Sequence, residues 1–220
     1  MDTAILSLKN LTFYRNEKPI FEPITFDVFQ GDVVHVKGKN GSGKTTLLRM
    51  LIGALHPSEG NIEYNHIEIN RTRFEYLSNL VYVGHKVALK SSLTALENLA
   101  WISGRDKKCE SLIKALEDMG LSEKKNVLCG ELSVGQQRKL TLARILVSDA
   151  KIWFLDEPFN TLDSDGFTLL RDLIEAHKNN QGIVVYASHQ NVSISDVKTI
   201  QLEKAIPVSY THLRAHETEY

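Results

Sequence analysis

Residues 33–51 read VVHVKGKNGSGKTTLLRML and change from a β-rich to a helical pattern within one short segment. A β-branched run comes first, a segment with three glycines and a lysine follows, and leucines at helical spacing come last. Gly38, Gly43, Lys44 and Thr45 fit the pattern G-x-x-x-x-G-K-[ST], in the strand-to-helix setting that the pattern requires. Glycine and lysine at these positions make a poor core, so the segment is predicted to serve binding or turning.

The loop between the strand and the helix has the properties of an anion-binding cradle. Its glycines let backbone N–H groups point inward, and the helix N-terminus adds partial positive charge. Lys44 is expected to reach the outer phosphates of a nucleotide, and Thr45 to ligate Mg²⁺. A glycine-rich turn that binds nothing is the alternative, and the cradle alone fits a kinase, a GTPase or an ATPase. The predicted nucleotide-binding residues of this loop are Gly38, Lys39, Asn40, Gly41, Ser42, Gly43, Lys44, Thr45 and Thr46.

A second motif, which is acidic, lies at residues 152–158, and these read IWFLDEP. An apolar strand that ends in two carboxylates can present Asp156 to Mg²⁺ and Glu157 to a water that attacks the γ-phosphate. Asp156 is therefore predicted to be a metal ligand, and Glu157 the general base. The alternative is a solvated acidic turn after a strand.

The order of the elements favours an α/β fold. Short β-rich runs in residues 5–36 indicate strands at the edge of a sheet, and a strand pair is expected around Asn65. Helical patterns begin at Thr94 and cover residues 107–119 and 134–147, whereas strands are expected at 152–155 and 183–186 with a helix around 167–178 between them. Strands that alternate with helices predict a mostly parallel sheet covered on both faces.

The composition excludes several classes of protein. The chain has 220 residues, 42% of them hydrophobic, which is enough for one large domain or two small ones. A formal net charge of -1 provides no general attraction to nucleic acid or acidic lipid, and no nucleic-acid partner is predicted. No apolar run is long enough to cross a bilayer, so a cytosolic chain without direct membrane insertion is expected. The two cysteines, Cys109 and Cys129, are interpreted as packing thiols.

A third motif, LSVGQ at residues 132–136, connects the other two to a known family. Ser133 is a natural N-cap and Gly135 permits close approach, so the start of this helix is a second candidate anion site. In this order and spacing, the three motifs resemble those of ABC-transporter ATPases. The resemblance implies that Ser133, Gly135 and Gln136 contact nucleotide, that ATP and Mg²⁺ are the cofactors, and that two copies pair head to tail.

Further positions are assigned from this resemblance. His189 matches the switch histidine that contacts the γ-phosphate and is taken as catalytic with Glu157 and Lys44, although a histidine at a strand end is often a core residue. Asp163 in the sequence NTLD matches the loop at the dimer interface. Two positions depart from the family pattern: Tyr14 or Arg15 stands where an aromatic residue stacks on adenine, and His85 where a glutamine is usual.

The Gly84-His85 pair is similar to the haem-exporter ATPases of cytochrome c maturation, the CcmA type. Residues 93–99 (LTALENL), 135–138 (GQQR), 156–159 (DEPF) and 188–190 (SHQ) agree as well, and the resemblance covers about residues 5–204. It implies an ATP-hydrolysing subunit that works with integral membrane subunits of the CcmB/CcmC type at the cytoplasmic face of the bacterial inner membrane. The ATPase of another exporter and a soluble ABC-type assembly factor remain as alternatives.

The expected fold is that of a P-loop NTPase of the ABC ATPase type. It has a mostly parallel sheet core, an N-terminal antiparallel β subdomain and an inserted helical subdomain. The ATPase domain is placed at residues 1–206, with the helical insert at about residues 85–148. Residues 207–220 are interpreted as a non-native or disordered tail.

Overall fold

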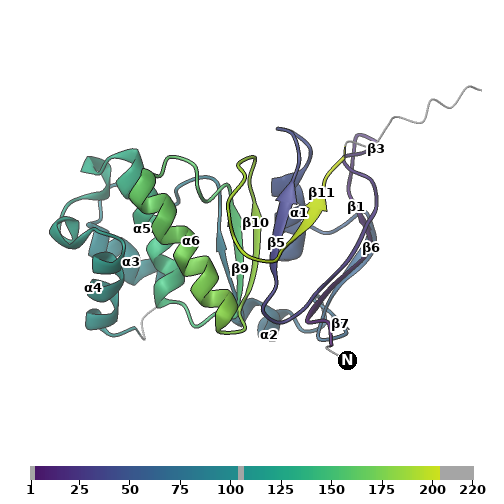
Figure 1. The fold of residues 1–220 in the computed structure, drawn as a ribbon, viewed down its shortest axis with the longest axis horizontal. Helices are drawn as coiled ribbons and strands as arrows, with labels where there is room; N and C mark the ends of the chain where they lie inside the picture. Colours follow the sequence, from purple (N-terminus) through teal and green to yellow (C-terminus); the bar gives the residue numbers. More distant parts are fainter. Residues whose placement is uncertain (1–2, 104–106, 204–220) are drawn as a thin grey trace, which may run out of the picture.

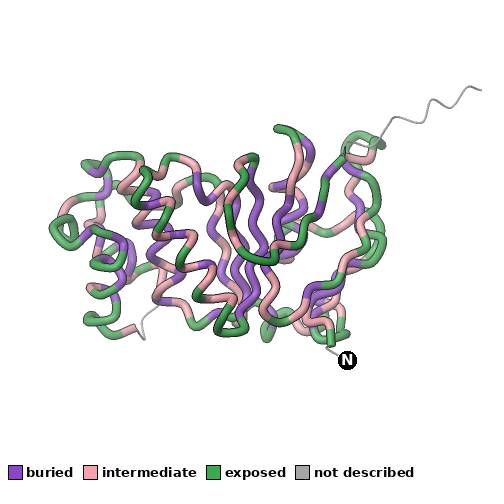
Figure 2. Tube along the Cα trace, viewed as in Figure 1, coloured by how far each residue is buried: buried purple, intermediate pink, exposed green. Residues whose placement is uncertain are grey.

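A five-stranded parallel sheet forms the centre of the computed structural model, which describes residues 3–103 and 107–203 (Figure 1). The strand order is β11-β5-β10-β9-β8, and every neighbouring pair is parallel. All residues of β9 and β10 are buried, which is typical of parallel strands covered on both faces (Figure 2). The strands are β5 (Val33–Lys37), β8 (Leu80–Val83), β9 (Ile152–Asp156), β10 (Ile183–Ala187) and β11 (Val197–Gln201).

An antiparallel sheet lies on one side of this centre, with helix α1 (Lys44–Leu51) between the two sheets (Figure 1). Its order is β4-β1-β6-β7, and a separate two-stranded sheet pairs β2 with β3. Buried leucines of α1 share one hydrophobic cluster with residues of β1 and β5, so α1 is held by both sheets. The strands are β1 (Leu6–Thr12), β2 (Tyr14–Arg15), β3 (Lys18–Pro19), β4 (Ile24–Val28), β6 (Glu59–Tyr64) and β7 (Ile67–Glu68).

Helices cover the opposite face of the parallel sheet. Helices α3, α4 and α5 pack against one another, and their buried residues form a second hydrophobic cluster together with Trp153 and Leu155 of β9. Ile152 and Phe154 belong to the first cluster, because successive residues of a strand point to opposite faces. The helices of this face are α3 (Ala95–Ser103), α4 (Cys109–Asp118), α5 (Val134–Val147) and α6 (Ser164–Asn179), with short 3-10 turns η1 (Ser122–Lys124) and η2 (Cys129–Glu131). Helix α2 (Arg73–Ser78) packs on the other side, because its Tyr76 belongs to the first cluster.

The carboxyl ends of the parallel strands meet at one edge of the sheet. Ala187 at the end of β10 is in register with Asp156 at the end of β9 and with Val36 of β5. Val83 at the end of β8 is in register with Leu155. The segments that follow these strands therefore converge, as is usual for ligand sites in parallel α/β sheets.

The predicted fold class is confirmed, whereas several local expectations are wrong. Strands β1 and β5 do not lie at a sheet edge, because each has a neighbour on both sides. Helix α1 ends at Leu51, where the quoted leucine-rich stretch ends, because Gly53 takes a left-handed conformation with φ 69°. Cys129 is buried as expected, but Cys109 is exposed and is not a packing thiol.

Two further expectations concern the ends of the chain and the membrane. The interpretation of residues 207–220 as a tail lies outside the described residues. Among the residues that the structure describes, no helix is both long enough and apolar enough to cross a bilayer.

Candidate functional site

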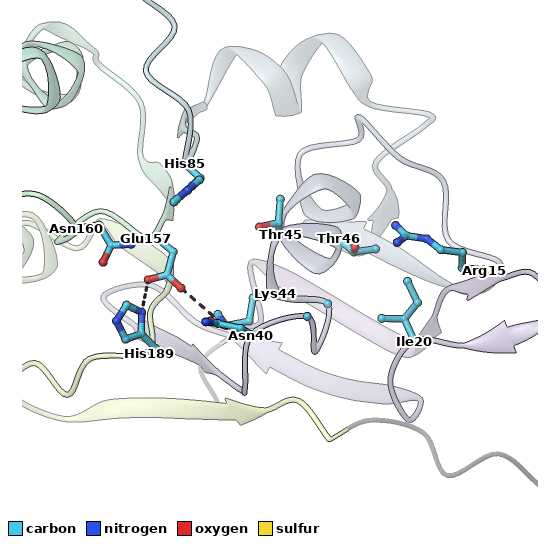
Figure 3. Close-up of a pocket in the computed structure, with 12 residues that line it drawn as sticks. Arg15, Ile20, Asn40, Lys44, Thr45, Thr46, His85, Glu157, Asn160 and His189 are labelled. Atoms are coloured by element: carbon cyan, nitrogen blue, oxygen red, sulfur yellow. Dashed lines mark hydrogen bonds and ion pairs between the residues drawn. The ribbon is translucent and has the colours of Figure 1, made fainter. Parts of the chain in front are cut away.

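A cavity of about 440 Å³ opens at the carboxyl edge of the parallel sheet (Figure 3). Its walls come from the loop after β5, the start of α1, and the segments after β8, β9 and β10. A volume of this size is within the range of small-molecule and cofactor sites. The lining residues are Arg15, Ile20, Asn40, Gly41, Gly43, Lys44, Thr45, Thr46, His85, Glu157, Asn160 and His189.

The glycine-rich loop is shaped by backbone conformations that only glycine adopts readily. Gly41 and Gly43 have φ values of 79° and 101°, and Gly43 is the N-cap of α1. A Cβ atom on Gly43 would lie 2.7 Å from side-chain atoms of both Ile20 and Phe21. The loop therefore needs glycine at this position both for its φ value and for close packing. Residues of this loop and of the first turn of α1 line the cavity where the sequence predicts phosphate binding.

Three charged or titratable side chains predicted to be catalytic meet in the cavity (Figure 3). Lys44 Nζ lies 3.6 Å from Glu157 Oε1 and donates a 3.0 Å hydrogen bond to the Gly38 carbonyl oxygen. His189 Nδ1 lies 3.0 Å from Glu157 Oε2. The alternative of a core histidine is wrong for His189, because its side chain is 52% exposed. Glu157 thus contacts the cradle lysine through one carboxylate oxygen and the histidine through the other.

Thr45 and Asp156 form the second polar pair predicted from the sequence. Thr45 Oγ1 donates a 2.9 Å hydrogen bond to Asp156 Oδ2. Asp156 is buried, and its other oxygen, Oδ1, has no hydrogen-bond partner among the described residues. Burial raises the pKa of Asp156, while the Thr45 hydrogen bond and the charge of His85 oppose that rise. A buried carboxylate oxygen without a partner, beside a threonine hydroxyl, suits a hard cation such as Mg²⁺.

The two positions that depart from the family pattern both reach the cavity. His85 follows β8 and lines the same cavity as Glu157. Arg15 and Ile20 lie at the far end of the cavity from Glu157 and His189 (Figure 3). Tyr14 is not among the lining residues, so Arg15 is the one of the two candidates that the structure places at the site.

The LSVGQ segment does not contribute to this cavity. Ser133 is the N-cap of α5: its hydroxyl accepts from Gln136 N at 3.2 Å, and Gln136 Oε1 accepts from Ser133 N at 3.0 Å. Ser133 and the neighbouring Val134 are exposed. The twelve lining residues include none from 132–136, so Ser133, Gly135 and Gln136 form a separate, surface-facing helix start.

Asp163 caps the helix that follows the acidic strand. Its carboxylate accepts from Gly166 N at 2.9 Å and from Lys139 Nζ at 3.0 Å. The Lys139 hydrogen bond is the main cause that lowers the pKa of Asp163. Lys139 lies on α5, so this pair joins the LSVGQ helix to α6. The assignment of Asp163 to a dimer interface stays a prediction.

Sequence reasoning missed two residues of this region. Asn160 lines the cavity, but nothing in its sequence context separates it from an ordinary turn residue. Arg138 is 2% exposed and contacts the segment that carries both carboxylates. A signal for Arg138 existed, because it falls on the same stripe of α5 as Leu142 and Ile145, both of which are buried.

The sequence is similar to a known protein family and to its members. The family profile described as "ABC transporter" matches residues 21–160. A Histophilus somni protein named "Cytochrome c biogenesis ATP-binding export protein CcmA" is 39% identical over 207 residues, which cover 93% of this chain and 95% of that protein. The chain belongs to the CcmA family of ABC transporter proteins. The resemblance drawn from the three motifs is thereby confirmed.

A second relative and two solved structures are also similar to this chain. A protein of the same name from Shewanella oneidensis is 42% identical, with 91% of this chain and 93% of that protein covered. A putative ABC transporter ATP-binding protein from Pyrococcus furiosus superposes with a TM-score of 0.77 at 30% identity, covering 90% of this chain and 96% of that one. The cbiO1 structure from Clostridium perfringens, part of the ABC transporter complex cbiONQ, gives 0.70 at 25% identity, with 86% and 80% covered. This chain shares the ABC ATPase fold with both solved structures.

Proposed function

We propose that this chain is the ATP-binding and ATP-hydrolysing subunit of an ABC transport complex that serves cytochrome c biogenesis, through haem export or release of a haem chaperone. One observation carries the proposal: Lys44, Glu157 and His189 meet over a glycine-rich helix start inside a single cavity. A cation on the cradle and a carboxylate beside it are what phosphoryl transfer to water requires. The names of the CcmA relatives support the cellular role.

The roles of the side chains follow from their positions. The loop N–H groups and Lys44 would bind the phosphates and stabilise the charge that develops on them. Glu157, 12% exposed and hydrogen-bonded to His189, would accept the proton of the attacking water, and His189 would hold the carboxylate in orientation and contact the γ-phosphate. Arg15 and Ile20, at the other end of the cavity, would face the base and sugar of the nucleotide.

The residues present also fit Mg²⁺. Thr45 and Asp156 are the groups that would hold the ion, because the hydroxyl and the partnerless Asp156 Oδ1 are oxygen donors side by side. The ion would neutralise phosphate charge when bound. His85 stands near Asp156, and we infer that it takes the place of the usual glutamine at this edge of the metal site.

The partners follow from the surface-facing LSVGQ helix start. Ser133, Gly135 and Gln136 do not line the cavity of their own chain, and they would contact the ATP of a second copy in a head-to-tail dimer. The pair would act on integral membrane subunits of the CcmB/CcmC type, and the chain would work at the cytoplasmic face of the inner membrane.

The direct test of the cradle is Lys44→Ala. Removing the ammonium group should abolish ATP binding or turnover, because it faces the developing phosphate charge. ATP binding is measured by isothermal titration and hydrolysis by phosphate release, with Lys9→Ala as the control for loss of a lysine outside the cavity. Near-normal turnover in Lys44→Ala would show that the active site lies elsewhere.

A further inference from the structure

Arg138 makes a set of contacts that the proposed reaction does not yet use. Its guanidinium donates to the carbonyl oxygens of Asp156 at 3.0 Å, Glu157 at 2.8 Å and, more weakly, Pro158 at 3.4 Å. A fourth hydrogen bond, of 2.8 Å, goes to the carbonyl oxygen of Gly84. One side chain of α5 thus binds the segments after β9 and β8, which carry Glu157 and His85.

The segment that Arg138 holds is conformationally strained. Glu157 has φ 48°, a left-handed conformation that is unfavourable for a residue other than glycine. Strain of this kind persists only where the surroundings determine the conformation. Here Glu157 N donates to the Ala187 carbonyl oxygen at 2.8 Å, and Arg138 donates to the Glu157 carbonyl oxygen. The two contacts fix the backbone from which the Glu157 side chain projects toward His189.

Arg138 carries a buried positive charge, and burying a charge is unfavourable unless other groups compensate it. Arg138 is 2% exposed and, among the described residues, has no carboxylate within ion-pair distance. Burial lowers the pKa of its guanidinium, while the charges of Asp156 and Glu157 oppose that change. Arginine stays protonated in proteins, so the buried charge is compensated by four carbonyl dipoles and two nearby carboxylates. A planar fork of donors is needed to reach carbonyls on two separate segments.

We propose that Arg138 is a positioning residue: it holds Glu157 in the geometry required for base catalysis and ties it to the Gly84-His85 turn. The inference rests on the proposed ATP hydrolysis with Glu157 as the base. Lysine keeps the positive charge but, as a point donor, cannot span the same carbonyl oxygens. Arg138→Lys should therefore lower kcat about 10- to 100-fold, the scale expected when a reacting group is misplaced by about 1 Å. ATP affinity should change less than about threefold, because none of these four hydrogen bonds of Arg138 goes to the cradle residues 38–46.

The experiment is a double-mutant cycle between Arg138→Lys and Glu157→Gln, with kcat and the ATP dissociation constant measured for each variant. If Arg138 acts through Glu157, Arg138→Lys should reduce the residual rate of Glu157→Gln by less than about twofold. Arg144→Lys, the same substitution further along α5, is the control and should leave kcat unchanged. Thermal unfolding reports whether each variant is folded.

The outcomes separate the two proposals. Wild-type kcat in Arg138→Lys, or a full additional loss in the Glu157→Gln background, would overturn the positioning role alone. Failure of both Arg138→Lys and Arg138→Gln to fold would also overturn it, because Arg138 would then be required for folding and not for positioning. A wild-type chain that neither bound nor hydrolysed ATP would overturn the proposed function, and the inference with it.

Discussion

Asp156→Asn should stabilise the chain in the absence of nucleotide and Mg²⁺, although it removes a predicted metal ligand. Asp156 is buried, and its Oδ1 has no hydrogen-bond partner among the described residues. An unsatisfied buried acceptor costs about 1–3 kcal/mol, and more when it is charged. The amide oxygen can keep the Thr45 hydrogen bond, and the amide NH2 at the Oδ1 position is as unpartnered as the oxygen it replaces, so the gain comes from removing the buried charge. We expect a net gain of about 1 kcal/mol and a rise in Tm of about 2–4 °C.

The pH dependence has a defined sign. Burial raises the pKa of Asp156, so the folded chain holds this proton more tightly than the unfolded chain does. The stability contributed by the protonated carboxyl is present at low pH and is lost as the pH rises above the ordinary aspartate value of about 4. Asp156→Asn removes this loss, so its advantage over the wild type should grow between acidic and neutral pH.

Differential scanning fluorimetry measures both effects. Asp27→Asn, at an exposed carboxylate on β4, is the control and should shift stability by less than about 0.5 kcal/mol. At a fixed MgATP concentration of about 100 times the wild-type dissociation constant, the free energy of unfolding should rise by about 2.7 kcal/mol for the wild type and by much less for Asp156→Asn. A variant less stable than the wild type without nucleotide, or equally stabilised by MgATP, would refute this reasoning.

Two further predictions concern glycines. Gly43→Ala should destabilise the chain by about 2–5 kcal/mol, since left-handed strain costs about 1–2 kcal/mol and the clash with Ile20 and Phe21 about 1–3. Gly41→Ala has the same strain, but no atom lies within 4 Å of the added Cβ, so chemical denaturation should show a loss of stability of only about 1–2 kcal/mol. Equal losses of stability in the two variants would contradict the packing argument. In a hydrolysis-deficient background, Gly135→Asp should abolish ATP-induced dimerisation by size exclusion while ATP binding persists, because position 135 lies outside the cavity. A variant that still dimerised on ATP would exclude Gly135 from the interface.

Much of the fold was predictable because its signals are local. The glycine loop between a β-branched run and a leucine-rich helix needs only its own residues, and α5 begins and ends at Val134 and Val147 as predicted. The Asn65 turn was also predictable, since Asn65 and His66 take φ values of 49° and 65° between β6 and β7. Strand order was not, because it depends on partners far along the chain.

The site divides in the same way. The loop, Asp156, Glu157 and His189 carry motif signals, and the structure brings them together as the sequence predicts. Arg138 was overlooked because its spacing to Leu142 and Ile145 indicates only that it is buried, and not what its guanidinium contacts. Its function depends on carbonyl groups of the segments after β8 and β9, and backbone acceptors leave no trace in side-chain identity.

The central claim, that Glu157 is the base for ATP hydrolysis over the glycine loop, is tested most directly by Glu157→Gln. The amide keeps the size of the side chain but cannot accept the proton of the attacking water. ATP affinity and the rate of phosphate release should be measured on the same preparation. The account predicts unchanged ATP binding with hydrolysis reduced about a hundredfold or more. A rate equal to that of the wild type would contradict it and would assign the base to another group, with His189 the nearest candidate.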